Sequence, residues 1–197
     1  LGSLGLLLDS GREADVRAGL TRIDGLLQRM AILTGHLKTF ARKSPAGLNE
    51  RLLLSDVLEQ ALLLLAPRLR SEQVELRRDV RSEARVSGDA IRLEQVVLNL
   101  LNNALDAMVD SPQRTLGVLI ELQGDSCVLQ VSDTGGGIAE ENLGSVFEPF
   151  FTTKPVGEGL GLGLAISYGI VRDLGGNLEA RNGPDGAIFI LRLPRAG

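Results

Sequence analysis

Amide side chains recur along one face of a segment whose pattern predicts a helix, residues 89–109. Gln95, Asn99 and Asn103 lie four residues apart, so a helix places them together, while leucine, valine and methionine side chains occupy the opposite side. Amide oxygens suit a hard cation such as Mg²⁺, which keeps several waters and shares phosphate oxygens with its protein ligands. The same pattern also fits the solvated face of an amphipathic helix.

A second candidate site is the segment DTGGGI, residues 133–138, directly after a predicted strand. An aspartate at a strand end can accept a hydrogen bond from an exocyclic amine. The glycines that follow allow the backbone to approach a flat ring closely. An ordinary turn after a strand has the same composition.

Two further segments lie in the glycine-rich part of the chain that follows. Residues 147–154 (FEPFFTTK) hold three of the five phenylalanines and predict a hinged lid, or else a small hydrophobic cluster beneath a long loop. Residues 157–164 (GEGLGLGL) run into a predicted helix, where backbone N–H groups are placed to bind phosphate. No G-x-x-x-x-G-K-[ST] motif occurs, which excludes a P-loop.

The elements that must position these segments form a two-layer α/β sandwich, with helices on one face of a mixed sheet. Alternating apolar residues and turn signals predict the strands, and 3.6-residue periodicity predicts the helices. Helices are expected over residues 55–70, with Ser55 and Asp56 as the cap, 89–109 and 161–174. Strands are expected over residues 74–80, 84–87, 116–123, 126–132, 176–181 and 187–193, with hairpin turns at residues 124–125 and 182–186.

The N-terminal part follows a different pattern. Apolar residues spaced alternately four and three apart from Val16 to Phe40 predict a heptad-like helical stripe. A break at residues 44–47 (SPAG) separates it from the mixed pattern. We therefore expect a helical hairpin remnant over residues 1–44 and a second domain over residues 48–197.

Composition excludes several classes of protein. The chain has 197 residues, of which 44% are hydrophobic, and a net charge of -4, so a basic nucleic-acid-binding surface is not expected. The lone Cys127 cannot form an internal disulfide, and no apolar run approaches the roughly 20 residues that span a bilayer. These features favour a cytoplasmic location. The chain begins at Leu1, so an excised piece of a longer protein is expected.

Taken together and in this order, the four segments resemble the N, G1, F and G2 boxes of the ATP-binding domain of sensor histidine kinases, in the GHKL superfamily. The resemblance covers residues 48–195, and the fold that it implies is the Bergerat-type sandwich. Residues 150–159 look like sensor kinases of the C4-dicarboxylate and nitrogen-regulation type, and residues 33–42 are similar to the second dimerisation helix of that group.

The resemblance implies ATP and Mg²⁺ as cofactors and assigns roles to individual residues. Asn103 would coordinate Mg²⁺ with Asn99 close to the metal and the phosphates, and Asp133 would bind the adenine amine. Lys154 in the lid would meet the terminal phosphates. The other implied nucleotide-binding residues are Gly135, Gly137 and Ile138 around the adenine, and Gly159, Leu160, Gly161, Leu162 and Gly163 around the phosphates.

One position bears on the type of reaction. Related ATP hydrolases such as gyrase carry a glutamate four residues before the metal-binding asparagine, where this chain has Asn99. An amide is not a general base at neutral pH, which favours phosphoryl transfer over hydrolysis. A GHKL ATP hydrolase and a non-catalytic interaction module are the alternatives. Many histidine kinases have a basic residue and an aromatic just after the N box, where this chain has Asp106 and Ala107, so the groups that neutralise the phosphates are left open.

The resemblance also implies partners. The family transfers phosphate to a histidine on the first dimerisation helix and then to a response regulator receiver domain. The lone His36 has no adjacent carboxylate, so the acceptor is expected to lie before Leu1 and the fragment is not expected to phosphorylate itself. Residues 12–43 are expected to form a homodimer. A membrane is expected to be contacted only through parts of the parent protein outside this chain.

Overall fold

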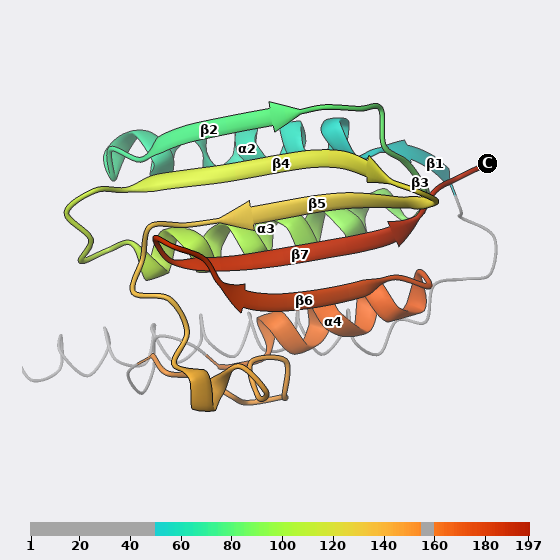
Figure 1. Ribbon diagram of the computed structural model, residues 1–197. Helices are drawn as coiled ribbons and strands as arrows, with labels where there is room; N and C mark the ends of the chain where they lie inside the picture. The colour runs from blue at the N-terminus through green and yellow to red at the C-terminus, as the bar shows by residue number, and fades with distance from the viewer. Residues whose placement is uncertain (1–49, 155–159) are drawn as a thin grey trace, which may run out of the picture. The chain divides into compact units, whose positions relative to one another are not determined.

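The computed structural model describes residues 50–154 and 160–197, in which five strands form the main sheet in the spatial order β2-β4-β5-β7-β6 (Figure 1). β2 runs parallel to β4, and all other neighbours are antiparallel. The sheet is therefore mixed, as predicted. Its strands are β2 Glu75–Val80, β4 Thr115–Gln123, β5 Ser126–Ser132, β6 Asn177–Asn182 and β7 Ala187–Pro194.

Three helices cover one face of this sheet (Figure 1), which confirms the predicted two-layer α/β sandwich. They are α2 Leu54–Ser71, α3 Ala90–Ala107 and α4 Gly163–Asp173. α3 lies between the other two helices and packs on β4 and β5. A short 3₁₀ turn, η1 Glu140–Asn142, lies in the connection from β5 to α4.

The core forms where the helices meet the sheet. In β5, alternate residues Cys127, Leu129 and Val131 are buried towards the helices, as the two-residue period of a strand requires. α3 presents a wide apolar face, and each fully buried leucine there contributes about 1.5–3 kcal/mol. Its buried side chains are Leu93, Val96, Val97, Leu100, Leu101, Ala104 and Leu105. The opposite, amide-bearing face of α3 is thereby left half-buried at the edge of the core.

The start of α3 is fixed by a side chain next to it in the sequence. Asp89 caps the helix, because its Oδ1 accepts hydrogen bonds from the backbone N of Ile91 at 2.9 Å and of Arg92 at 3.2 Å. The predicted β4–β5 hairpin is also confirmed, with Gly124 at φ 60° in the turn. Sequence signals that are local in the chain are thus realised close to their expected positions.

The start of the domain differs from the prediction in one missed strand and one wrong helix cap. A strand that the sequence pattern did not reveal, β1 Glu50–Leu53, pairs with β3 Arg85–Gly88 in a separate antiparallel sheet. α2 begins at Leu54, directly after β1, so Ser55 and Asp56 already lie inside the helix and do not cap it. The Leu54 N–H donates instead to the Ala84 carbonyl at 2.9 Å. The backbone carbonyl of Ala84 therefore accepts the hydrogen bond from the first N–H group of α2, and no side chain caps this end of the helix.

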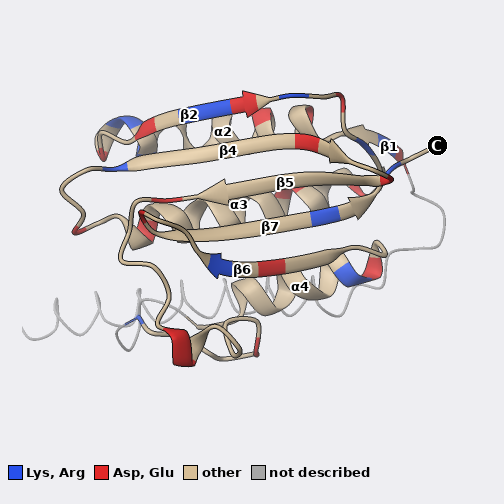
Figure 2. Cartoon of the chain, viewed as in Figure 1, with Lys and Arg blue, Asp and Glu red and all other residues tan. Residues whose placement is uncertain are grey.

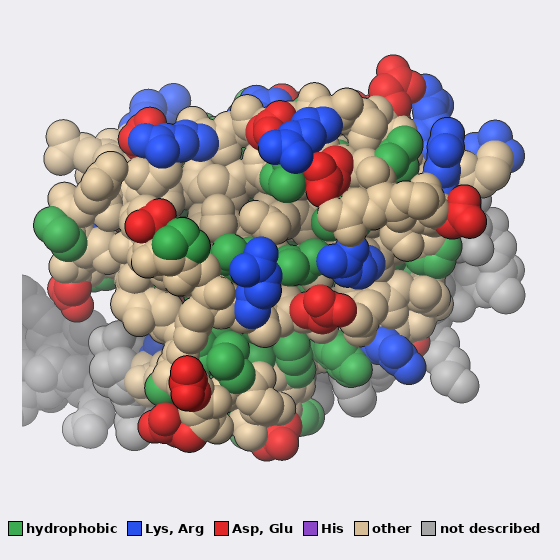
Figure 3. Space-filling view, viewed as in Figure 1, with side chains coloured by type: hydrophobic (Ala, Val, Ile, Leu, Met, Phe, Trp, Pro, Cys, Tyr) green, Lys and Arg blue, Asp and Glu red, His purple; other side chains and the backbone are tan. Residues whose placement is uncertain are grey.

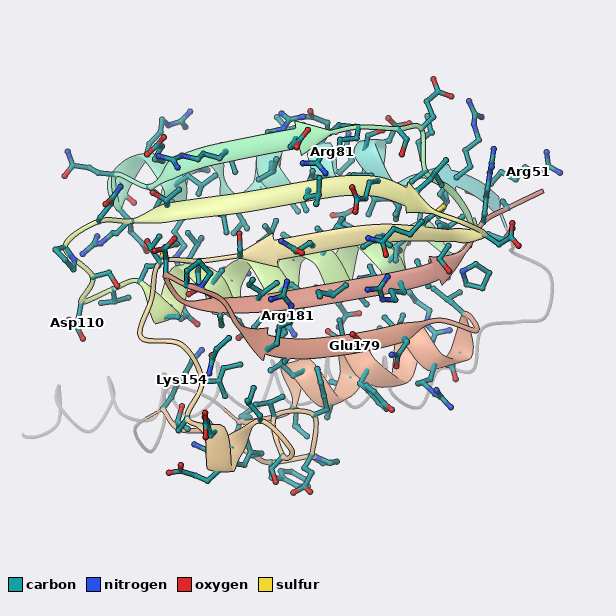
Figure 4. All side chains as sticks on the ribbon, in the orientation of Figure 1. Arg51, Arg81, Asp110, Lys154, Glu179 and Arg181 are labelled. Carbon is teal, nitrogen blue, oxygen red and sulfur yellow. The ribbon has the colours of Figure 1, made fainter. Side chains whose placement is uncertain are left out.

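The other face of the main sheet carries charged side chains on its edge strands (Figure 2). Arg81, Glu179 and Arg181 lie on this face (Figure 4), and Arg81 forms ion pairs with Asp79 at 2.7 Å and Glu121 at 2.9 Å. Apolar side chains lie between the charged ones (Figure 3), with Val128, Ile188 and Ile190 forming a small buried cluster. Exposed ion pairs of this kind contribute little to stability.

No helix in the described part of the chain is both long enough and apolar enough to cross a membrane. The predicted hairpin remnant, residues 1–44, lies outside the described residues. The predicted dimerisation segment, residues 12–43, and His36 lie outside them as well.

Candidate functional site

Asp133 is a buried carboxylate at the end of β5, only 5% exposed. Its Oδ1 accepts hydrogen bonds from the backbone N of Gly135 at 2.9 Å and of Ala187 at 3.2 Å. Burial raises the pKa of the Asp133 carboxyl, and the two backbone hydrogen bonds offset part of that rise. No described residue donates a hydrogen bond to Oδ2, so this oxygen is available to an amine donor on a ligand.

Glycines allow the backbone to close tightly around this carboxylate. A Cβ on Gly186 would lie 2.3 Å from the Asp133 carbonyl oxygen, and a Cβ on Gly135 would lie 2.6 Å from the Ala107 carbonyl oxygen at the end of α3. Gly137 adopts φ 70°, a left-handed conformation that costs glycine nothing. Gly135 and Gly137 therefore meet a steric and a conformational need, whereas a Cβ on the exposed Gly136 would meet no atom within 4 Å.

Ile138, the last residue of this segment, is held by a side chain from β6. The Ile138 N–H donates to Asn182 Oδ1 at 2.8 Å, and Asn182 Nδ2 donates to the Ile138 carbonyl at 2.7 Å. Both backbone groups of Ile138 are thus paired with a single amide. The sequence analysis did not single out Asn182, because it lies in a predicted turn and shows no periodic or motif signal.

Asn99 connects α3 to the start of α4. Its Nδ2 donates to Ser167 Oγ at 3.0 Å, and a Cβ on Gly163 would lie 2.3 Å from Asn99 Oδ1. A side chain at position 163 would therefore require the Asn99 side chain or the start of α4 to move. Ser167, which is buried, is a second residue that the sequence analysis missed. The only signal for it was its spacing, one helical turn after Gly163.

Asn103 lies midway between the two glycine contacts on α3. Gly163 approaches Asn99, four residues before Asn103, and Gly135 approaches Ala107, four residues after it. The two contacts are separated by about 12 Å along the helix axis at 1.5 Å per residue. No described residue hydrogen-bonds the half-buried Asn103 side chain. Both glycine segments and the amide face of α3 thus converge on one site.

The start of α4 is fixed by a residue outside the helix. Gly161 adopts φ 64°, and a Cβ there would lie 2.4 Å from the Phe150 carbonyl carbon and 2.4 Å from the Phe151 carbonyl oxygen. The predicted helix start at residue 161 was therefore two residues early. The N-cap residue Leu162 provides no side-chain cap, so the first N–H groups of α4 are available to an anion. Two other residues were expected to bind the phosphates. Leu160 is exposed, and Gly159 lies outside the described residues.

Lys154, in the lid segment (residues 147–154), is ion-paired with Asp106 of α3. Asp106 Oδ1 also accepts a hydrogen bond from Arg68 Nη2 at 2.6 Å. Burial opposes ionisation of Asp106, but hydrogen bonds and positive charge from Lys154 and Arg68 outweigh it and hold the pKa of Asp106 below its usual value.

The rest of the lid segment packs partly on α4. The Phe147 ring stacks on Tyr168 of α4, with ring centroids 5.3 Å apart. Phe150 is 73% exposed and adopts φ 69°, an uncommon conformation for an aromatic residue. Phe147 therefore packs on α4, while Phe150 is left in solvent, and closure of this segment as a lid stays a prediction.

The chemistry of this site fits a nucleotide with a hard cation. A buried carboxylate suits an amine donor, amide oxygens suit Mg²⁺, and open N–H groups at a helix start suit phosphate. Across residues 50–154 and 160–197, no group of three or more His, Cys, Asp or Glu side chains is arranged to hold a metal ion.

Comparison with known proteins supports the same interpretation. The family model described as "Histidine kinase-, DNA gyrase B-, and HSP90-like ATPase" matches residues 88–197. The C4-dicarboxylate transport sensor protein DctB of Pseudomonas aeruginosa is 41% identical over 187 residues, which cover 94% of this chain and 30% of that protein. DctB of Rhizobium meliloti is 37% identical over 190 residues, which cover 96% of this chain and 30% of that protein.

A solved structure with the same fold is the nucleotide-free catalytic domain of histidine kinase ThkA, with a TM-score of 0.68 and 29% identity over 75% of this chain and 95% of that one. The chain spans 30% of the length of each DctB relative. The family match extends over more than half of the chain and includes α3, Asp133 and the start of α4. The chain therefore belongs to the histidine kinase-, DNA gyrase B- and HSP90-like ATPase family, and its relatives are sensor histidine kinases.

Proposed function

We propose that the chain binds ATP with Mg²⁺ and is the catalytic part of a sensor histidine kinase. The observation that carries the proposal is the convergence of both glycine segments on α3 around Asn103, with the buried Asp133 at one end. In this assignment Asp133 Oδ2 accepts the adenine amine, and Gly135, Gly137 and Ile138 border the base. Gly161, Leu162 and Gly163 present the start of α4 to the phosphates.

Asn103 and Asn99 would supply amide oxygens to the cation, which when bound would neutralise phosphate charge. Asn103 carries most of this role in the proposal, because Asn99 is also engaged by Ser167. Lys154 would leave Asp106 and approach the terminal phosphate. Gly159 is assigned to the phosphates by motif alone.

Transfer to a histidine is favoured over hydrolysis by the residue at position 99. The Asn99 amide donates to Ser167 and has no basic atom with which to activate water. The acceptor histidine, the response regulator that receives the phosphate and dimerisation through residues 12–43 belong to the same proposal. So does a cytoplasmic location as the inner portion of a membrane-bound sensor, which agrees with the sensor names of the relatives.

Calorimetry with ADP, with and without Mg²⁺, tests the binding part of the proposal. Tight binding is expected only with Mg²⁺, and Asn103→Ala should abolish the difference. Gln95→Ala, which changes a residue two turns earlier on the same face of α3, is the control and should bind like the wild type. Equal binding with Mg²⁺ and with excess chelator would contradict the assignment of Asn103.

Labelled ATP tests the reaction. When a polypeptide carrying the acceptor helix of the parent kinase is added, label should move to its histidine and exceed the phosphate released to solvent. Steady phosphate release without labelling of the acceptor would instead support the alternative, a GHKL ATP hydrolase.

A further inference from the structure

Asn182 makes two complementary hydrogen bonds to one residue of the segment after Asp133. It accepts from the Ile138 N–H at 2.8 Å and donates to the Ile138 carbonyl at 2.7 Å. A carboxylate lacks the donor for this pattern, and a hydroxyl is too small to meet both groups. The contact joins residues that lie 44 positions apart in the chain.

The β6–β7 hairpin holds this segment at both of its ends. At the first end, the Asp133 N–H donates to the Ala187 carbonyl at 3.1 Å, and the Ala187 N–H donates to Asp133 Oδ1 at 3.2 Å. At the other end, Asn182 holds Ile138. The Asn182 end depends on a single side chain, so it is the end that a substitution can release.

The first part of the segment has anchors besides the hairpin, because Thr134 Oγ1 accepts from the Thr115 N–H at 2.9 Å and donates to the Gln113 carbonyl at 2.7 Å. The part after Gly135 has fewer contacts. A Cβ added to Gly136 would meet no atom within 4 Å, and a Cβ added to Gly137 would lie 3.0 Å from Asn182 Oδ1. Three successive glycines have no side chains with which to anchor themselves. Among the described residues, the hydrogen bonds that hold the later part of the segment, residues 136–138, are those of Asn182.

We propose that Asn182 is a positioning residue for nucleotide binding, which acts through Ile138 to hold residues 135–138 against the base. The inference rests on the proposed function, because it takes Asp133 and Ile138 to border the adenine. Asn182 does not contact the nucleotide in this assignment. It fixes in advance a segment that would otherwise have to be ordered when the ligand binds, and such ordering weakens affinity.

The experiment measures ADP affinity in the presence of Mg²⁺ for Asn182→Ala, Asn182→Asp and the control Asn177→Ala. Asn177 lies at the other end of β6, and its Nδ2 donates to Glu179 at 2.8 Å, so the control also removes an amide hydrogen bond from the same strand. We expect Asn182→Ala to bind about tenfold more weakly, from the loss of two hydrogen bonds, and Asn177→Ala to match the wild type. Asn182→Asp should also bind more weakly, because a carboxylate cannot donate to the Ile138 carbonyl.

Double-mutant cycles separate positioning of the base from general destabilisation. Asn182→Ala combined with Asp133→Asn should lose less affinity than the sum of the single losses, because both act on the base. Combined with Lys154→Gln, on the phosphate side, the losses should add. Hydrogen exchange at the Ile138 amide should accelerate in Asn182→Ala, since that N–H loses its acceptor.

Two outcomes would overturn the proposal. One is an Asn182→Ala affinity equal to that of Asn177→Ala. The other is coupling to Lys154→Gln as large as the coupling to Asp133→Asn. Failure of the wild type to bind ADP would contradict the proposed function. Normal binding by the wild type together with either of the two outcomes above would contradict only the role of Asn182.

Discussion

Lys154 of the lid segment is ion-paired with Asp106 of α3, one helical turn beyond Asn103. Asp106 is shared with Arg68, which also pairs with Glu72 at 2.7 Å. Two cations and two carboxylates therefore neutralise one another beside the proposed nucleotide site. The charge that a phosphate would need from Lys154 is already balanced, so a ligand has to compete with Asp106 for it.

This competition predicts that Asp106→Asn tightens ATP binding. Removing one negative charge leaves the cluster with a net positive charge, and the expected gain is about fivefold at low salt. Lys154→Gln should have the opposite effect. Calorimetry at two ionic strengths measures both changes.

Asp110→Asn is the matched control, because Asp110 is an exposed carboxylate just beyond the same end of α3 (Figure 4). Its ATP affinity should equal that of the wild type, and none of the three variants should change adenosine binding. An Asp106→Asn variant that binds ATP as weakly as Lys154→Gln would show that Asp106 places the lysine and does not compete for it.

Asp133→Asn should weaken ADP binding by about 1.5–3 kcal/mol, the usual contribution of a hydrogen bond to a charged group. The free energy of unfolding should not fall in parallel, because burial already disfavours the native carboxylate. Calorimetry and denaturant unfolding measure the two quantities. Unchanged affinity would remove Asp133 from the base site, and a large loss of stability would point to a structural role.

The same carboxylate predicts a pH dependence. Because burial raises the pKa of Asp133, protonation in the free protein should begin at a higher pH than for an ordinary aspartate. As the pH falls through this raised pKa, ADP affinity should fall with it. Since the folded pKa lies above the unfolded one, the contribution of this group to stability decreases as the pH rises between the two values.

A pH titration of ADP affinity in the wild type and in Asp133→Asn checks this prediction. The wild type should lose affinity in the acidic limb, and the variant should lack that step. If both proteins lost ADP affinity over the same acidic pH range, the loss would be due to a group other than Asp133.

Substitution by alanine should change stability in opposite directions at two glycines, one just before α4 and one within it. Gly161→Ala should lower the free energy of unfolding by more than about 1 kcal/mol and impair ADP binding, because φ is 64° and a Cβ would meet backbone atoms of Phe150 and Phe151. Gly169→Ala, within α4 and with open space around it, should raise stability by about 1 kcal/mol. Thermal and denaturant unfolding of both variants test the pair. Equal effects of the two substitutions would contradict the described path of the chain at Gly161.

Much of the fold could be predicted because its signals are local. The apolar face of α3 and the β4–β5 turn at Gly124 each depend on residues a few positions apart. β1 was missed because four residues that pass straight into a helix show no alternation that a pattern could detect. The roles assigned to Asn99, Asn103, Lys154 and the glycines stay predictions until ligand binding is measured.

The sequence by itself determined the sandwich architecture, the order of the four motifs and the residue types of the proposed nucleotide site. Only the tertiary structure decided which side chains hold those residues in place. Asn182 holds Ile138 from 44 residues away, Ser167 holds Asn99 from 68 residues away, and Asp106 holds Lys154 from 48 residues away. Periodicity and turn chemistry act over a few residues, whereas these contacts exist only once the sheet and helices have packed. No local pattern encodes them, and packing alone brings them together.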